Sequence, residues 1–237
     1  MTTAIVLQAR MGSTRLPGKV LAPVGGRTIL AQCIDRLRAH SRLPVIVATT
    51  TLGEDDLVAR EARRCGADVL RGPADDVLGR FAMVVRAFGL EALVRATADN
   101  PAVDLDAPQR TLGLLHRTGA DHIDERGLPI GAAVEAVTAK AILQAGDLAV
   151  DPYDREHIAP YIRREKRFRA LDALAPGHLR APKLRLTIDT AEDLDFVRRA
   201  FAAVETADPA PLAAIIAGAA TLEPLVPTRG RSKTERR

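Results

Sequence analysis

The chain has 237 residues, a length that favours one sizeable domain. Hydrophobic residues make up 47% of the chain and charged residues 27%, which excludes a wholly disordered or fibrous protein. Aromatic residues make up only 3% and tryptophan is absent, so the composition excludes the stacking of bases on aromatic side chains as the main activity.

The positive charge of the chain is concentrated at its C-terminus. Lysine and arginine number 34 against 30 aspartates and glutamates, but the last ten residues contain five basic groups and one acidic group. Once these ten are set aside, 29 charges of each sign remain, so the net charge does not indicate a nucleic-acid partner. We expect a single domain over residues 1–223 and a disordered basic tail over residues 224–237.

Cysteine usage and apolar run lengths indicate the compartment. Cys33 and Cys65 are the only cysteines, and they lack the spacing of metal-binding or redox motifs, so both are expected to be core thiols. No run of about 18 apolar residues occurs, and the N-terminus enters a strand pattern at once. We therefore expect a cytoplasmic protein with no membrane partner.

Short apolar segments alternate with segments of helical periodicity along the chain. We expect strands at residues 4–7, 45–48, 68–70, 93–96, 134–137 and 184–188. We expect a helix beginning at Thr28 and helices at residues 54–65, 75–88, 108–118, 154–165 and 190–201, with a polar excursion at 121–131. Because these strands are continuously apolar, the sequence predicts an α/β fold with a mostly parallel sheet covered by helices on both faces.

The segment after the first expected strand, QARMGSTRLPGKVL over residues 8–21, combines small residues with cations. Backbone N–H groups around Gly12 and Ser13, flanked by Arg10, Arg15 and Lys19, are typical of an anion cradle. Cations concentrated on one turn repel one another unless an anion or carboxylates lie near, which favours a polyphosphate ligand. The segment matches neither GxxxxGK[ST] nor GxGxxG. The alternative is a turn with solvated cations.

This segment resembles the nucleotide-binding signature of the cytidylyltransferases that make CMP-activated sugar acids, especially their spore-coat-polysaccharide branch. Further ordered blocks resemble the same family: ATTTLGEDD, RGPADDVLGRF, RATADNPAVD, DREHIAPYIRRE and LRLTIDTAEDLDFV. The resemblance implies a Rossmann-like nucleotidyltransferase fold of the GT-A type and a CTP substrate. It also implies Mg²⁺ or Mn²⁺ as cofactor, release of pyrophosphate, and a homodimer.

The resemblance also implies roles for individual residues. Arg10, Lys19 and Asp99 match catalytic positions, and Asp99 and Asp189 match metal-binding positions. The implied nucleotide-binding residues are Ala9, Arg10, Gly12, Ser13, Thr14, Arg15, Lys19, Thr49, Arg71, Asp75 and Arg80. Asp75 equally suits a helix N-cap, and Arg80 equally suits a surface position.

Two aspartates also stand out by position. Asp99 and Asp189 each follow an expected strand, and neighbouring parallel strands would deliver both carboxylates to one edge of the sheet. Mg²⁺ takes one or two carboxylates together with phosphate oxygens and water. The alternative is that Asp99 begins an Asp-Asn-Pro turn and that Asp189 precedes an N-cap.

An acidic acceptor calls for cationic side chains, because a guanidinium fork suits a carboxylate or a phosphonate. The candidates are Arg126, Arg155, His157, Arg163 and Arg164. His157 could equally be a hydrogen-bonded helix residue. The acceptor expected from the resemblance is a 2-keto sugar acid or a small phosphonate, with residues 120–165 as the region of acceptor and dimer elements.

Two other functions stay open. A nucleotide-sugar-dependent glycosyltransferase would need a metal site on one loop, which Asp104 and Asp106 formally spell as Asp-Leu-Asp. A non-catalytic nucleotide-binding protein could use the same cradle. Pyrophosphate release distinguishes the transferase hypotheses, and turnover of CTP separates an enzyme from a nucleotide-binding protein.

Overall fold

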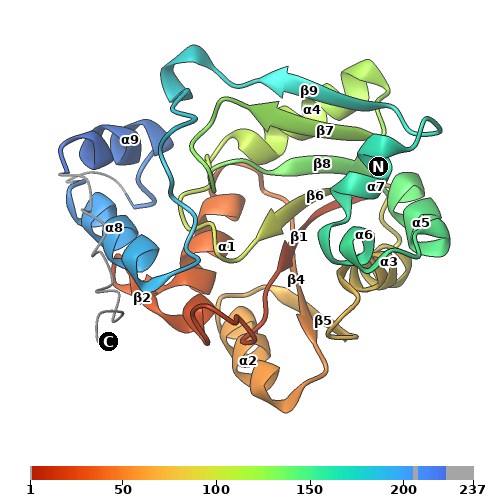
Figure 1. The fold of residues 1–237 in the computed structure, drawn as a ribbon, viewed down its shortest axis with the longest axis horizontal. Coiled ribbons are helices and arrows are strands. Elements are labelled where there is room, and N and C mark those ends of the chain that lie inside the picture. The colour runs from red at the N-terminus through yellow and green to blue at the C-terminus, as the bar shows by residue number, and fades with distance from the viewer. Residues whose placement is uncertain (1, 205–207, 223–237) are drawn as a thin grey trace, which may run out of the picture.

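A seven-stranded sheet forms the middle of the molecule (Figure 1). The computed structural model describes residues 2–204 and 208–222, so the expected basic tail at 224–237 lies outside the described residues. The strand order is β5-β4-β1-β6-β8-β7-β9. The strands are β1 Thr3–Gln8, β4 Val45–Thr50, β5 Asp68–Gly72, β6 Ala92–Thr97, β7 His122–Arg126, β8 Glu135–Thr138 and β9 Ala170–Leu174.

The strand directions confirm a mostly parallel sheet. β1 pairs in parallel with β4 on one side and β6 on the other, β4 pairs in parallel with β5, and β7 with β9. In this sheet β8 is the strand that runs against its neighbours, since it is antiparallel to both β6 and β7. Because the chain leaves β1 for β4 and β5 and then returns to β6, the strand order switches at β1 and β6.

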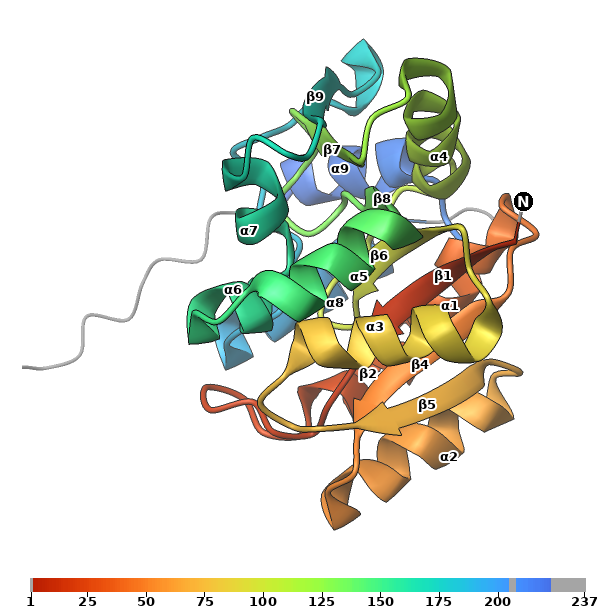
Figure 2. The ribbon, with the colours of Figure 1, turned by 90° about the vertical axis from the view of Figure 1, so that its right-hand side faces the viewer.

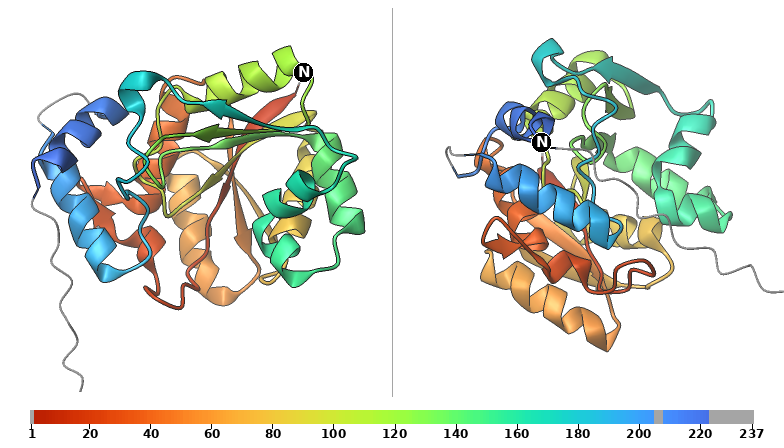
Figure 3. Two further views of the ribbon diagram at one scale, coloured as in Figure 1. Left: turned by 45° about the horizontal axis from the view of Figure 1, so that its top comes forward. Right: turned by 60° about the vertical axis from the view of Figure 1, so that its left-hand side comes forward.

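Helices cover both faces of the sheet, as expected. Figure 2 shows α3 and α5 side by side over one face, and Figure 3 shows α8 and α9 on the far side from α5, α6 and α7. The helices are α1 Ile29–Ala39, α2 Asp56–Arg64, α3 Val77–Phe88, α4 Ala107–Thr118, α5 Ala139–Leu148, α6 Pro152–His157, α7 Ala159–Arg164, α8 Ala191–Ala202 and α9 Leu212–Ala220. None of the helices in the described ranges is long and apolar enough to cross a membrane.

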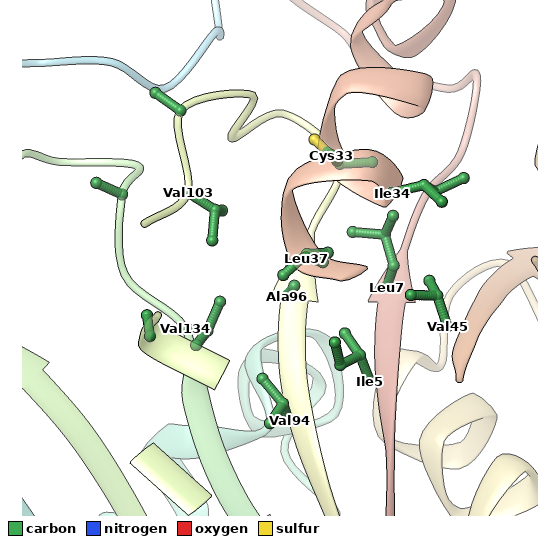
Figure 4. Packing of buried hydrophobic residues seen from close by; sticks show 14 of the residues in the cluster. Ile5, Leu7, Cys33, Ile34, Leu37, Val45, Val94, Ala96, Val103 and Val134 are labelled. Atoms are coloured by element: carbon green, nitrogen blue, oxygen red, sulfur yellow. The ribbon is translucent and has the colours of Figure 1, made fainter. Parts of the chain in front are cut away.

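The core is aliphatic, as the scarcity of aromatic residues requires. Under α1, the side chains of Ile34 and Leu37 pack over Ile5 and Leu7 of β1 (Figure 4). Each of these four side chains is fully buried, which stabilises the fold by about 1.5–3 kcal/mol per side chain. A separate cluster on the opposite face holds α3, α5 and α7 against the sheet.

Local sequence signals set several helix ends. The Thr28 hydroxyl accepts a hydrogen bond from Ala31 N at 3.1 Å, which begins α1 where the sequence predicts. Thr190 and Asp193 form a capping box that begins α8 and confirms the expected start. Gly89 ends α3 with φ of 59°, a left-handed conformation that favours glycine.

The expected single helix at 154–165 is wrong, because the chain forms α6 and α7 with a break at Ile158. Ile158 has φ of 63° and begins a new helix instead of continuing the first. Pro160 explains the break, since it has no N–H to donate and its ring would clash with the carbonyl four residues earlier. The break leaves Glu156 and His157 at the end of α6.

The expected polar excursion at 121–131 is also wrong in part, because residues 122–126 form β7. His122 and Glu125 are buried in this strand and pair with other charged or polar groups, so an apolar pattern could not reveal it. The strand expected at 184–188 is replaced by an extended segment with one bridge, between Ile130 and Arg185.

Four further features are absent from the sequence prediction. They are the hairpin of β2 Pro23–Val24 with β3 Arg27–Thr28, helix α5, the edge strand β9, and α9. Residues 120–165 form β7, β8 and α5 to α7, and they belong to the same sheet and core as the rest of the chain.

Candidate active site

A cleft of about 360 Å³ opens at the carboxyl ends of β1 and β6. In doubly wound sheets, ligands bind at this switch of strand order. The loop after β1 forms one wall, and the ends of β6 and α6 form the other. The lining residues are Gln8, Ala9, Arg10, Gly12, Ser13, Thr14, Arg15, Lys19, Val20, Arg95, Thr97, Ala98, Asp99, Glu156, His157 and Asp189.

The loop after β1 folds back on itself and is held in place by hydrogen bonds to the backbone of Met11. Gly18 N and Ser13 N both donate to Met11 O, at 3.0 and 2.8 Å. Met11 N donates to the fully buried Asp55 carboxylate at 2.6 Å. Gly18 has φ of 70°, which favours glycine and turns the chain into Lys19. Seven residues of this loop line the cleft, namely Ala9, Arg10, Gly12, Ser13, Thr14, Arg15 and Lys19, and all seven are among the predicted nucleotide-binding residues.

Lys19 brings the two predicted metal-binding aspartates together. Its ammonium lies 3.0 Å from Asp99 Oδ2 and 3.1 Å from Asp189 Oδ1, and it donates to Ile188 O at 2.6 Å. Lys19 is only 8% exposed. Burial by itself would raise the pKa of Asp189, but the hydrogen bond and charge of Lys19, with help from Arg185 and Arg15, lower it.

The arrangement of the two carboxylates fits a divalent cation. Asp99 and Asp189 both reach one point, and a cationic group already lies there. Two carboxylates supply the protein share of a Mg²⁺ site when phosphate oxygens and water complete it. The described part of the chain has no cluster of three or more His, Cys, Asp or Glu side chains. Asp99 and Asp189 could hold a metal ion together, since an oxygen of each already lies within about 3 Å of one cationic group.

Arg10 and Arg15 flank the cleft with weaker contacts. Arg15 Nη2 lies 3.0 Å from Asp189 Oδ1, and its side chain is 63% exposed. Arg10 Nη2 lies 3.5 Å from Glu156 Oε1, and Arg10 Nη1 lies 3.4 Å from Ala74 O. Since these contacts are long or exposed, both guanidinium groups can turn toward an anion in the cleft.

Four of the implied nucleotide-binding residues do not line the cleft, namely Thr49, Arg71, Asp75 and Arg80. Thr49 is fully buried in β4, and Arg71 holds the following loop through Thr50 O and Leu52 O. Asp76, and not Asp75, caps α3. Arg80 is fully buried instead of lying on the surface, and burial, with the charge of Arg10, lowers its pKa.

Of the five acceptor candidates, His157 lines the cleft. Arg155 makes a two-pronged ion pair with Asp76, and Arg163 makes one with Asp172. Arg126 also contacts Asp172, at 3.2 Å. Arg164 pairs with the buried Asp154. These four guanidinium groups are engaged in structural ion pairs.

The structure adds cleft residues that the sequence reasoning missed. Gln8, Arg95 and Thr97 lie on β1 and β6, and Glu156 ends α6. Arg95 Nη1 donates to Glu135 Oε1 at 3.0 Å, and His122 Nε2 lies 3.3 Å from the other Glu135 oxygen. The one available signal was the alternation of Arg95 and Thr97 with apolar residues in an otherwise apolar strand.

Glu135 gives the fold a component of stability that acid removes. Burial by itself would raise its pKa, but Arg95 and His122 outweigh burial and lower the pKa from its ordinary 4.5 to about 2. A carboxyl with a lowered pKa stabilises the folded state above its unfolded pKa, and this stability is lost as the pH falls through the folded pKa.

We therefore expect Glu135→Gln to lose stability at pH 7 and to lose less than the parent on acidification from pH 5 to pH 2. The difference in the free energy of unfolding between parent and variant should shrink by about 2 kcal/mol over this range. Urea denaturation at several pH values measures it. Glu192→Gln, at an exposed carboxyl on α8, is the control. Parallel pH profiles for Glu135→Gln and the parent would contradict the expectation.

The Asp-Leu-Asp stretch does not form a metal site. Asp104 is buried and pairs with Arg110 at 2.7 Å, whereas Asp106 lies 2.8 Å from His40 Nδ1. The two carboxylates therefore face different partners. This favours Asp99 and Asp189 over Asp104 and Asp106 as the metal-binding pair.

Comparison with known proteins identifies the family. A cytidylyltransferase family model matches residues 4–208. The spore coat polysaccharide biosynthesis protein SpsF of Bacillus subtilis is 34% identical over 200 residues, which cover 81% of this chain and 83% of SpsF. A cytidylyltransferase structure from Leptospira borgpetersenii has a TM-score of 0.85 at 30% identity, with 92% and 93% of the two chains covered.

The fold recurs in more distant structures. A CMP:2-keto-3-deoxy-manno-octonic acid synthetase solved with CTP has a TM-score of 0.67 at 15% identity, with 85% of this chain and 99% of that chain covered. At this identity the likeness shows the nucleotidyltransferase fold alone. The family match, the close relatives and the cleft at the switch of strand order agree, and the chain is a nucleotidyltransferase that belongs to the cytidylyltransferase family.

Proposed function

We propose that this enzyme transfers CMP from CTP to an anionic acceptor, a 2-keto sugar acid or a small phosphonate, and releases pyrophosphate. The observation that carries the proposal is the convergence of Lys19, Asp99 and Asp189 beside the loop after β1. The relative with the CTP complex acts on a 2-keto sugar acid by its name, which supports the same class of acceptor.

The residues of the cleft suit the charge of the triphosphate. Backbone N–H groups of the loop, together with Arg10, Arg15 and Lys19, would bind the phosphate oxygens. Asp99 and Asp189 would hold Mg²⁺, or Mn²⁺ in its place, opposite them. When bound, the metal neutralises charge on the α-phosphate.

The transfer balances without a further reactant. An acceptor oxygen forms a bond to the α-phosphorus, and the bond from that phosphorus to the oxygen bridging to the β-phosphate breaks. Pyrophosphate leaves with the electron pair, and a proton carried by an acceptor hydroxyl passes to water. The role of the protein is to hold the two substrates in line and to stabilise the charge that develops.

A glycosyltransferase is the weaker candidate, because Asp104 and Asp106 face different partners. Pyrophosphate release from CTP, assayed with Mg²⁺ over a panel of 2-keto sugar acids and phosphonates, separates the two activities. If none of the acceptors on the panel leads to release of pyrophosphate, the proposed acceptor class is contradicted. If CTP does not bind, the proposed activity is contradicted. Homodimer formation is proposed on the family resemblance, and a cytoplasmic location is proposed on the cysteine usage.

CTP should protect the enzyme against thermal unfolding more than ATP, GTP or UTP. A ligand at a hundred times its dissociation constant adds about 2.7 kcal/mol of stability, which is easily measured as a shift in Tm. Each nucleotide is compared at equal concentration with Mg²⁺, and cytidine reports the share of the base. Equal shifts with all four nucleotides would contradict a cytidine-specific site.

A further inference from the structure

Three side chains form a polar wall of the cleft next to Asp99. Arg95 and Thr97 alternate with buried apolar residues on β6, and Gln8 of β1 lies opposite Thr97 in the parallel register. Residues two apart in a strand point to the same face of the sheet, so Arg95 and Thr97 share a face. We call these three residues the β1–β6 wall, and all of them line the cleft.

The β1–β6 wall holds two buried polar atoms without a partner among residues 2–204 and 208–222. They are Arg95 Nε, a cationic donor, and Gln8 Oε1, an acceptor. A buried polar atom left without a hydrogen bond costs about 1–3 kcal/mol, so natural proteins rarely keep one without a use. Both atoms are screened from solvent, so a ligand with an oxyanion and a hydroxyl would satisfy them once the two side chains turn toward the cleft that they line.

Arg95 differs from Arg155 and Arg163, two of the acceptor candidates. Arg155 and Arg163 each donate from two guanidinium nitrogens to one carboxylate, so fewer of their N–H groups are available for a ligand. Arg95 uses Nη1 on Glu135, a contact that orients its guanidinium. Glu135 is in turn held by His122, which is fully buried. Glu135 is therefore a positioning residue, and Arg95 keeps N–H groups for the cleft.

We propose that Arg95 binds an oxyanion of the acceptor and that Gln8 accepts a hydrogen bond from an acceptor hydroxyl, so that the acceptor is a hydroxylated acid. This inference rests on the proposed function, because it places the acceptor between the β1–β6 wall and the carboxylate of Asp99. The oxyanion can be a carboxylate or a phosphonate, since both suit a guanidinium.

The test uses Arg95→Met combined with Glu135→Gln, which removes the cation without leaving a buried charge unpaired. The matched control is Arg110→Met with Glu125→Gln and Asp104→Asn, which removes another buried ionic cluster, outside the cleft, and likewise leaves no carboxylate of that cluster unpaired. Arg95→Lys keeps the charge but lacks the guanidinium fork, so it serves if the double variant unfolds.

The measurement is calorimetric binding to enzyme saturated with the α,β-methylene analogue of CTP and Mg²⁺. The probes are 2-keto-3-deoxy-manno-octonic acid, 2-hydroxyethylphosphonate and the neutral polyol mannitol. We expect one or both acids to bind to the parent enzyme. Mannitol should bind neither to the parent nor to the Arg95 variants. The Arg95 variants should bind the acid about tenfold or more weakly, as expected for the loss of a charged hydrogen bond.

The control variant with Arg110→Met should bind the acid as the parent does. All variants should bind the CTP analogue as the parent does. Equal acid binding by the parent and the Arg95 variants would overturn the inference, as would an absence of binding by both acids when the analogue binds. If the parent fails to bind the analogue, the proposed function fails, and the inference fails with it.

Discussion

Asp99→Asn and Asp189→Asn should each lower kcat by at least about a hundredfold at saturating CTP, because stabilisation of the α-phosphate by a metal contributes several kcal/mol to the barrier. The substitutions remove charge with little change of shape, and in each variant Lys19 keeps one carboxylate and Ile188 O as partners. The fold should therefore survive. Pyrophosphate release and thermal unfolding, measured on the same samples, check both parts.

The double substitution tests whether the two aspartates share one ion. If they do, the double variant should be little slower than the slower single variant, because each substitution already disables the same site. Losses that multiply would indicate separate roles, with one carboxylate acting on the acceptor. Asp104→Asn is the matched control, since it removes a carboxylate paired with Arg110 outside the cleft. If kcat falls by a comparable factor in Asp104→Asn, the metal site would have to be assigned to Asp104 and Asp106 instead.

Lys19→Ala should weaken CTP binding by roughly tenfold or more while cytidine binding changes little, because in the proposed function the ammonium would contact phosphate and not the base. The sequence by itself suggests that free enzyme would hardly lose stability, since neighbouring cations repel. The structure reverses this expectation. Lys19 is buried between Asp99 and Asp189, and its removal leaves two carboxylates facing each other.

We therefore expect Lys19→Ala to lower the free energy of unfolding by about 1–3 kcal/mol in the absence of metal. Added Mg²⁺ should restore more stability to Lys19→Ala than to the parent, because the ammonium no longer competes for the two carboxylates. Thermal unfolding with and without Mg²⁺ measures this, and Lys140→Ala, at an exposed site on α5, is the control. An equal effect of Mg²⁺ on Lys19→Ala and on the parent would argue against a shared cation site.

The first half of the fold follows from local patterns. β1 and β4 are short, apolar and buried, β6 begins in the same way, and the helices between the strands have clear starts and stops, such as Thr28 and Gly89. Buried parallel strands require this pattern, so these strands and the fold class could be predicted. The loop from Ala9 to Lys19 could also be placed, because its cations and small residues directly follow β1.

The second half was decided by tertiary contacts. β7 carries His122 and Glu125, whose burial is tolerated only because Glu135 and Arg110 lie against them. The local sequence does not indicate which residues of other elements pair with His122 and Glu125. Strand β9 joins the sheet only by pairing with β7. The break at Ile158 was in principle readable from Pro160, but only the fold shows that it turns His157 into the cleft.

The site divides in the same way. The sequence by itself predicted which loop lines the cleft and that Asp99 and Asp189 lie close together. Asp99 follows β6, as the end of a strand in a parallel sheet requires, but Asp189 follows a segment that is not a strand of the sheet, and the hydrogen bond from Ile188 N to Asp99 O places it there. The sequence could not decide which arginines stay available for a ligand. Arg155 and Arg163 are held by Asp76 and Asp172, whereas Arg95, within an apolar strand, lines the cleft and uses only Nη1 on a carboxylate. An arginine's availability depends on carboxylates far away in the chain, and only the tertiary structure brings them into contact.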